Sequence, residues 1–472
     1  MSEPREIRDP VFGFIRIDGI EGDIVSSPIF QRLRRIRQLA FAHLVYPGAL
    51  HTRFEHSLGV CHIASLIANS LGVLNDEIKL IRLAALLHDI GHGPFSHVSE
   101  EALEIYTDKE KLPSDLNKTE KIHEHITADI IGNDPYIRRH IASVERDKII
   151  KILGEGYGDP LLRSIVSGPI DADKQDYLLR DSYFCGVKYG VFDRRQLHRE
   201  MRAVDDPPEG KHLMISKDGI HALEQFVLAK YYITNQVYRH RVRLITDQML
   251  IRAICLGIDI DQIEELYNLY RYDGSPEFIK DYVLWDDAKF LMTFLDRNFE
   301  GKYCHEFLVR LNERRLLKRI FDRPIKDLPE ICRDDLLNIS RPENKEQRTR
   351  LERYLWQPIC KTIKGKNLGK ITCNPEDDSH FLIIYSYTIK SVRAQSRNDE
   401  AAILVDRGPK GISTFEEESA LFNSINERLS EAFVELYAPV SYDTPVDRDK
   451  IKTTLDKIIL ENIVSFFEGG ER

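Results

Sequence analysis

The sequence lacks the features that mark secreted, membrane-spanning and nucleic-acid-coating proteins. No run of about 18 apolar residues occurs, so we expect no membrane span, and no apolar signal region opens the chain. The seven cysteines in 472 residues are scattered and form no Cys-x-x-Cys pair, which predicts neither a disulfide framework nor a thiolate zinc site. A net charge of -9 gives no overall basic field, so nucleic acid is not an expected partner. We expect a cytoplasmic protein in a reducing environment.

What is present is the composition of a globular protein, with 42% apolar and 30% charged residues. Its length allows two or three domains and a large core. The pattern predicts a mainly α protein, with a helical core and a smaller C-terminal α+β lobe. A change of composition at 333–350 predicts a boundary between domains 1–335 and 345–472. In order, we expect a hairpin within 7–25, helices at 29–39 and 58–71, a helix pair at 219–257, strands at 380–388 and 402–405, and helices at 416–437 and 451–467.

The most informative stretch, LLHDIGHGP, occupies residues 86–94. It follows a segment that is apolar on nearly every face, which predicts a buried helix that ends in the Gly-x-Gly-Pro sequence. We therefore expect His88 and Asp89 at the end of a helix in the core, where an unpaired carboxylate is costly. A divalent metal removes that cost, because imidazoles and carboxylates are ligands that such ions accept. The alternative is a carboxylate satisfied by an arginine beside a core histidine.

Two further segments carry charged residues in a helical pattern. The arginines of 29–39 predict either a solvated face or a phosphate-binding face, because Arg grips phosphates with a fork of donors. Asp173 and Asp176 lie three residues apart in a predicted helix and can share a face, although an acidic solvated face is the alternative.

Four donors, His56, His88, Asp89 and Asp173, come from three separate segments in the order His, His-Asp, Asp. This order resembles the signature of the HD superfamily, and residues 9–243 are similar to its dNTP triphosphohydrolases, both those with a SAM domain and the bacterial dGTPase-like ones. A fainter resemblance covers residues 381–438. The blocks that carry the resemblance are 30–34, 53–59, 88–97, 123–124 and 173–177.

The resemblance implies that these four residues hold one divalent metal, which could be iron, zinc or manganese. It also implies Mg²⁺ on the phosphates of the substrate. Such a metal lowers the pKa of a bound water and provides a hydroxide near neutral pH. By resemblance, that hydroxide attacks the α-phosphorus of a deoxynucleoside triphosphate, so that the products are deoxynucleoside and inorganic triphosphate.

The resemblance also assigns roles to the residues around the metal. His97 or His123 would give a proton to the departing oxygen, with His92 and Glu124 orienting the histidines or the water. Lys230 stands where the family often has Arg, and as a point charge it grips phosphate less specifically. The substrate-binding set is Arg53, Lys174 and Lys230 for the phosphates, Tyr177 and Tyr238 for sugar and base, and Gln38 and Asp181 for the 3′-hydroxyl.

Finally, the resemblance implies assembly and regulation. Arg5, Gln31 and Arg34 match positions that bind a nucleotide activator at an oligomer interface, and we expect a homotetramer or homodimer. Ser26 stands where an acidic residue reads guanine in a related enzyme, which argues against a guanine nucleotide as activator. Two other functions stay open: a phosphohydrolase for another nucleotide or a phosphodiester, and a non-catalytic nucleotide sensor.

Overall fold

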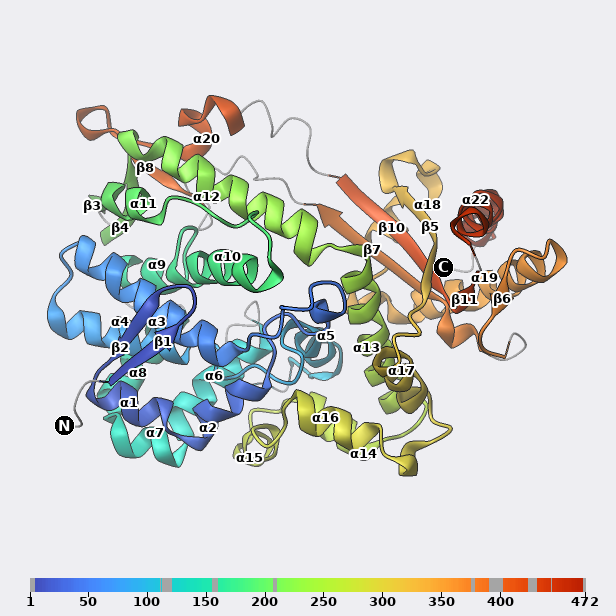
Figure 1. Cartoon of the computed structure of the whole chain (residues 1–472), viewed down its shortest axis with the longest axis horizontal. Helices are drawn as coiled ribbons and strands as arrows, with labels where there is room; N and C mark the ends of the chain where they lie inside the picture. Colours follow the sequence, from blue (N-terminus) through green and yellow to red (C-terminus); the bar gives the residue numbers. More distant parts are fainter. Residues whose placement is uncertain are drawn as a thin grey trace. The chain divides into compact units, whose positions relative to one another are not determined.

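The computed structural model describes residues 5–110, 112, 121–154, 160–206, 210–374, 378–389, 402–422, 431–442 and 444–469. The chain divides into two compact units, coloured along the sequence in Figure 1. Unit 1 comprises Met1–Arg243, Ile254–His305 and Val392–Ile425, and unit 2 comprises Leu244–Ala253, Glu306–Ser391 and Asn426–Arg472. Residues 333–350 lie within unit 2, so the linear division into 1–335 and 345–472 stays a prediction.

Unit 1 is built mainly of helices, as the sequence predicts. They are α1 (Gly19–Val25), α2 (Pro28–Gln31), α3 (Arg53–Ser70), α4 (Asn75–Leu87), α5 (His97–Tyr106), α6 (Ile122–Asn133), α7 (Pro135–His140), α8 (Ser143–Leu153), α9 (Pro160–Val166), α10 (Ala172–Cys185), α11 (Arg194–Glu200), α12 (Ile220–Ile233), α14 (Glu264–Tyr270), α15 (Pro276–Tyr282), α16 (Asp287–Phe294) and α20 (Phe415–Glu418). Helices α13 (Arg241–Asp259) and α17 (Tyr303–Asn312) have residues in both units.

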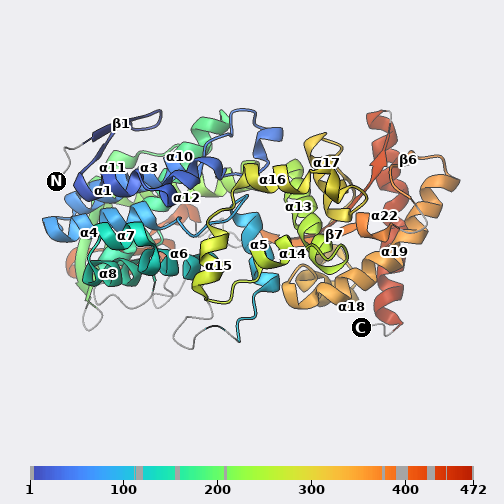
Figure 2. The same ribbon diagram turned by 90° about the horizontal axis from the view of Figure 1, so that it is seen from below.

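Helices α3, α4 and α10 form the part of unit 1 that positions the candidate site. A capping box between Thr52 and Glu55 begins α3, and α4 ends at Leu87 with His88 as its C-cap, before the Gly-rich sequence. Both α4 and α10 pack on α3, and Figure 2 shows α3 and α10 side by side. Because α3 is buried on most of its surface, polar side chains that it turns toward α4 or α10 must find partners inside the unit.

Two small sheets complete unit 1. Strands β1 (Arg5–Asp9) and β2 (Gly13–Ile17) form the N-terminal antiparallel hairpin, where sequence periodicity predicts one. The second sheet has the order β3 (Met201–Asp206), β4 (Gly210–Ser216), β8 (Leu404–Asp406) and β9 (Ile412–Thr414). Strand β8 pairs with β4 in parallel, which ties a distant segment of the chain into unit 1.

Unit 2 is an α+β layer structure. Strand β10 (Glu431–Ala438) lies between β5 (Lys318–Pro324) and β7 (Ile383–Ile389), and all neighbours are antiparallel. Strands β6 (Lys370–Ile371) and β11 (Val440–Ser441) form a short separate pair. Helices α18 (Glu330–Asn338), α19 (Lys345–Gly365) and α22 (Pro445–Glu468) bury side chains such as Leu355, Trp356 and Ile459 in one core with the sheet. The mainly α fold class with a smaller α+β lobe is thus confirmed.

Two predicted helices are wrong in part. Residues 431–437, predicted as the end of a helix from 416, form strand β10, because Val434 and Leu436 alternate toward the core in a strand that pairs on both sides. Part of that predicted helix, 423–430, lies outside the described residues. The helix predicted at 29–39 is only α2 followed by a 3₁₀ turn over Arg32–Arg35. Its Arg32 is buried and donates to the carbonyl of Trp285, 2.8 Å away, instead of lying on a solvated face.

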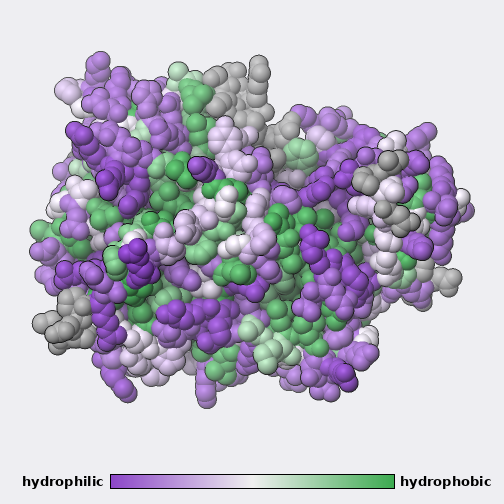
Figure 3. Space-filling view, viewed as in Figure 1, coloured by the Kyte–Doolittle hydropathy of each residue, from purple (hydrophilic) through white to green (hydrophobic). Residues whose placement is uncertain are grey.

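Across the described ranges, we find no helix with the length and apolar character needed to cross a lipid bilayer. Figure 3 shows hydrophilic and hydrophobic side chains mixed over the face in view.

Candidate metal centre

His56, on α3, presents one ring nitrogen to a cluster of carboxylates. Its Nδ1 lies 2.8 Å from Oδ2 of Asp176 on α10, so Nδ1–H donates to that carboxylate. Its Nε2 lies 3.0 Å from Oδ1 of Asp173 and 3.5 Å from Oδ2 of Asp89. Burial lowers the pKa of His56, but the hydrogen bonds to Asp173 and Asp176 outweigh burial and raise this pKa to about 10, so Nε2 carries a proton that a bound metal would displace. A carboxylate behind the imidazole is the usual way in which a metal-binding histidine is oriented.

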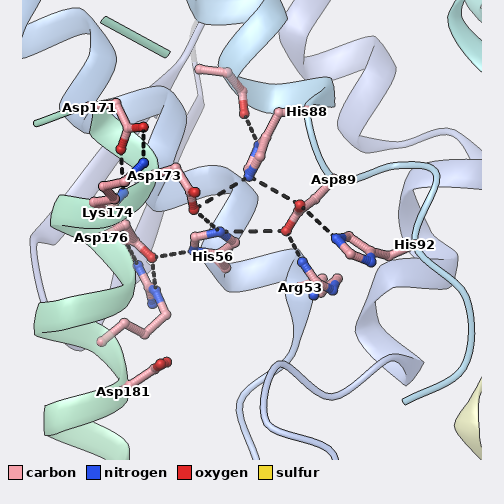
Figure 4. Close-up of polar contacts among 12 residues, drawn as sticks. Arg53, His56, His88, Asp89, His92, Asp171, Asp173, Lys174, Asp176 and Asp181 are labelled. Carbon is pink, nitrogen blue, oxygen red and sulfur yellow. Dashed lines mark hydrogen bonds and ion pairs between the residues drawn. The ribbon is translucent and has the colours of Figure 1, made fainter. Parts of the chain in front are cut away.

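His88 is oriented in the same sense by a backbone group. Its Nδ1 lies 2.8 Å from the carbonyl oxygen of Ala85, to which Nδ1–H donates. Its Nε2 is buried and has no hydrogen-bond partner among the described residues. This atom lies 3.3 Å from Oδ1 of Asp89 and 3.8 Å from Oδ1 of Asp173, and Figure 4 shows both imidazoles turned toward the two acids. An unpartnered buried nitrogen that faces carboxylates fits a metal ligand.

The two carboxylates are ionised. Burial raises the pKa of Asp89, but Arg53 and the neighbouring imidazoles outweigh it and hold this pKa well below its usual range. The pKa of Asp173 is likewise lowered, because the hydrogen bond from His56 outweighs burial. The donor atoms of His56, His88 and Asp173 lie within 4.8 Å of one another. Imidazole nitrogens and ionised carboxylates suit iron, zinc or manganese, so these residues fit the metal that the sequence predicts, without selecting among the three.

The alternative explanation for Asp89, pairing with an arginine, holds for one of its oxygens. Arg53 Nη1 donates to Oδ2 of Asp89, and both side chains are buried. Oδ1 instead lies 3.3 Å from the nitrogens of both His88 and His92. The arginine therefore holds Oδ2, the oxygen nearer to His56, and leaves Oδ1 facing His88 and His92.

A row of histidines leads away from the carboxylates. The rings of His92 and His123 stack with centroids 3.8 Å apart, and His97 meets His92 edge-on at 5.5 Å. His123 Nδ1 lies 2.7 Å from Oε2 of Glu100. Burial, then the charge of Arg53, holds the pKa of His92 well below its usual value, so His92 is neutral.

Comparison with known proteins agrees with this geometry. The HD domain family matches residues 53–165, which include His56, His88 and Asp89, and the HD associated region matches residues 192–350. An uncharacterized protein of Mycoplasma genitalium is 33% identical over 336 residues, which cover 68% of this chain and 77% of that protein. The chain belongs to the HD phosphohydrolase family.

Three further comparisons find relatives of the chain among curated sequences and solved structures. An uncharacterized protein of Methanocaldococcus jannaschii is 34% identical over 322 residues, or 68% of this HD chain, which spans 60% of that relative's length. The human deoxynucleoside triphosphate triphosphohydrolase SAMHD1 is 27% identical over 357 residues, 70% of this chain and 57% of the enzyme. A solved phosphohydrolase from Bacteroides thetaiotaomicron superposes with a TM-score of 0.67 at 25% identity, over 92% of this chain and all of that one.

On the α10 side of the HD site, Asp181 forms a second polar centre. Its two oxygens lie 2.7 Å from His51 Nε2 and 2.5 Å from the hydroxyl of Tyr238. The rings of Tyr177 and Tyr238 meet edge-on at 6.1 Å. Gln38 joins this group through its backbone N–H, which donates to the carbonyl of His51, and its buried Oε1 has no partner within the described part of the chain.

The predicted phosphate-binding lysines differ in their surroundings. Lys174 donates to Asp171 at 2.7 Å and to the carbonyl of Gly168 at 2.9 Å. Desolvation, followed by the like charge of Lys174, lowers the pKa of Lys230.

Glu124 is exposed and accepts from the N–H of Lys121 at the start of α6, so its observed contact is a helix cap.

The three predicted activator residues come from β1 and from the segment 28–35, and their side chains bind near Val25 and Ser26 or bind one another. Arg5 donates to the hydroxyl of Ser26 at 3.3 Å, and Gln31 donates to the carbonyl of Val25 at 2.7 Å. Arg34 donates to Gln31 at 2.8 Å and lies over the ring of Phe54.

Sequence reasoning missed several residues that support the site. Glu100 orients His123, and His51 holds Asp181. Phe95 and Ser96 have positive φ angles of 61° and 57°, and this strained turn is held by Asp287, which accepts from the N–H of Phe95 at 2.7 Å. Positive φ angles at Phe95 and Ser96 could not be predicted from the sequence. Glu100 could have been considered, because it is an acidic residue in the first turn of α5.

Replacing His88 tests the ligand assignment directly. We expect His88→Ala to lose bound transition metal, because one of the two buried imidazole nitrogens that face Asp89 and Asp173 disappears. His198→Ala is the matched control, since that imidazole binds Gln175 of α10 away from the cluster. Metal content measured by elemental analysis after purification with Mn²⁺ reports the result, and a His88→Ala protein that retains the wild-type metal content contradicts the assignment.

Gly59 gives a second prediction, because no side chain fits at its position. A Cβ there would lie 1.8 Å from Asp176 Oδ1 and 2.4 Å from Arg180 Nη2. We expect Gly59→Ala to displace this buried ion pair, at a cost of about 3–5 kcal/mol in unfolding free energy, and to weaken metal binding. Gly132→Ala, in a helix with room for a methyl group, is the control and should unfold at or slightly above the wild-type temperature. Calorimetry that finds equal melting temperatures for both variants would show that the pair tolerates displacement.

Proposed function

We propose that this HD protein hydrolyses deoxynucleoside triphosphates to deoxynucleoside and inorganic triphosphate. The observation that carries the proposal is the position of two polar centres on α10: Asp173 in the metal cluster and Asp181, two helical turns along, beside Tyr177 and Tyr238. Such spacing suits a substrate whose phosphates reach the cluster while its sugar rests on the tyrosines. The similarity to SAMHD1, which is a deoxynucleoside triphosphate triphosphohydrolase, supports the same substrate class.

His56, His88, Asp89 and Asp173 would hold the metal. A bound divalent ion supplies Lewis acidity, which polarises a phosphoryl oxygen and lowers the pKa of a coordinated water. Arg53 keeps one oxygen of Asp89 fixed, so the other is presented in one orientation. Asp176 and Ala85 hold Nδ1–H of the two imidazoles, so Nε2 is the nitrogen that each would give to the metal.

The histidine row would serve the leaving group. His123 would act as an imidazolium: its Nδ1–H stays with Glu100, which sets the orientation of the ring, and its Nε2–H would be the proton that is transferred. A positioned imidazole of this kind donates a proton to a departing oxygen, typically for a 10²- to 10⁴-fold gain in rate. Neutral His92, stacked between His123 and Asp89, separates the proton donor from the carboxylate.

The sugar would be held at Asp181. Its carboxylate accepts from His51 and Tyr238 and has further lone pairs for a 3′-hydroxyl. Tyr177 would pack against C2′, where it leaves no room for a ribose 2′-hydroxyl. Arg5, Gln31 and Arg34 would receive the phosphates of an activating nucleotide at the interface of a homotetramer or homodimer.

Product identity tests the proposed function. Purified protein loaded with Mn²⁺ or Fe²⁺ should convert each of the four common dNTPs to deoxynucleoside and triphosphate, identified by ³¹P NMR and chromatography. Asp89→Asn should be inactive, because the amide is a poor metal ligand. Release of pyrophosphate and monophosphate, or faster turnover of ribonucleotides, would overturn the proposal and favour another phosphohydrolase reaction.

The phosphate role of Lys230 gives a separate prediction. Lys230→Ala should raise the KM for the triphosphate roughly three- to fivefold with little change in kcat, the size of a partly exposed ion pair worth up to about 1 kcal/mol. Lys79→Ala, which removes an exposed lysine paired with Asp76 on α4, should leave the KM unchanged. Steady-state kinetics decide the matter, and an unaltered KM in Lys230→Ala removes this lysine from the phosphate contacts.

A further inference from the structure

Four buried side chains connect the N-terminal hairpin to His56. From the hairpin inward, Asp9 Oδ2 lies 2.8 Å from Arg180 Nη1, and Arg180 Nε lies 2.8 Å from Asp176 Oδ2. The same carboxylate oxygen accepts from His56 Nδ1 at 2.8 Å. None of these four residues is more than 4% exposed, so water does not screen the contacts.

Each contact in this row fixes the next. Arg180 grips both oxygens of Asp176, through Nε at 2.8 Å and Nη2 at 2.9 Å, which sets the plane of that carboxylate. The carboxylate in turn sets the ring of His56, and with it the direction of Nε2. The absence of a side chain at Gly59 leaves room for the pair.

Asp9 is the end of the row and also shapes the hairpin. Its Oδ1 accepts from the N–H groups of Val11 and Phe12, both at 2.9 Å, and so holds the turn, while Oδ2 faces Arg180. The ring of Phe12 lies 5.6 Å from the guanidinium carbon of Arg180. One carboxylate thus joins the conformation of the turn to the position of the guanidinium.

We infer that Asp9 is a positioning residue for the metal centre, acting on His56 through Arg180 and Asp176. The inference rests on the metal site of the proposed function but not on the identity of the substrate. The N-terminal hairpin is then a part of the metal-binding machinery, and a change at the turn alters metal affinity at His56.

Asp9→Asn is the variant that distinguishes the positioning role of Asp9 from its contribution to the folding of the hairpin. The asparagine oxygen still accepts from Val11 and Phe12, whereas its NH₂ group faces the Arg180 donors and removes the charged contact. Asp18→Asn is the matched control, because Asp18 directly follows β2 of the same hairpin but is exposed and pairs with Arg16, and Asn can also serve as the N-cap of α1. Titration of the full chain with Mn²⁺, followed by EPR, measures the dissociation constant, and circular dichroism checks the fold.

We expect Asp176→Asn to raise the Mn²⁺ dissociation constant about 10- to 100-fold, as loss of an outer-shell partner does, and Asp9→Asn to raise it by a smaller factor. In the Asp176→Asn background, Asp9→Asn should have no further effect, since the row is already broken. Wild-type affinity in Asp9→Asn, or the same weakening in both backgrounds, would overturn the inference. If the wild-type protein bound no Mn²⁺, Zn²⁺ or Fe²⁺, both the metal centre and this inference would be overturned. Failure to cleave dNTPs would count only against the proposed reaction.

Discussion

The hydrogen bond between His56 Nδ1 and Asp176 is the interaction on which the rest of the site depends. It holds Nδ1–H of a buried imidazole and so directs Nε2 toward Asp173 and Asp89. His88 obtains the same result from the carbonyl of Ala85, the last turn of its own helix. Two Nε2 atoms and two ionised carboxylates therefore meet inside a mainly apolar unit, where a bound cation would take the place of the proton between His56 and Asp173.

Opposite charges, some from the same helix and some from other segments, compensate this concentration of buried acids. Arg53 balances Asp89, Arg180 balances Asp176 and Asp9, and Lys174 balances Asp171. Every one of these pairs is largely buried, so removing one partner leaves an uncompensated charge rather than a solvated one. The same constraint explains why α3 has no side chain at Gly59, because the buried ion pair fills that space. The ion pair of Asp176 and Arg180 thus restricts both the charge at its own two positions and the size of the residue at position 59.

The sequence predicts the parts of this site that depend on local pattern. An apolar run that ends in Gly-x-Gly-Pro places His88 and Asp89 at the buried end of α4, and three-residue spacing puts Asp173 and Asp176 on one face of α10. Partners that arrive from other segments were not predictable in this way: Glu100 for His123, His51 for Asp181 and Asp9 for Arg180. In unit 2, an i, i+4 pattern of apolar residues suggested a helix through 437, although pairing with β5 and β7 makes 431–438 a strand. Tertiary pairing outweighs local preference there.

The central claim is that one cation lies between the two Nε2 atoms and the two carboxylates. Crystals grown with Mn²⁺, measured for anomalous scattering, test it most directly. The account predicts a single strong peak within about 2.0–2.3 Å of His56 Nε2, His88 Nε2 and an oxygen each of Asp89 and Asp173. A structure in which these four side chains point apart, with the anomalous peak elsewhere or missing, would contradict it.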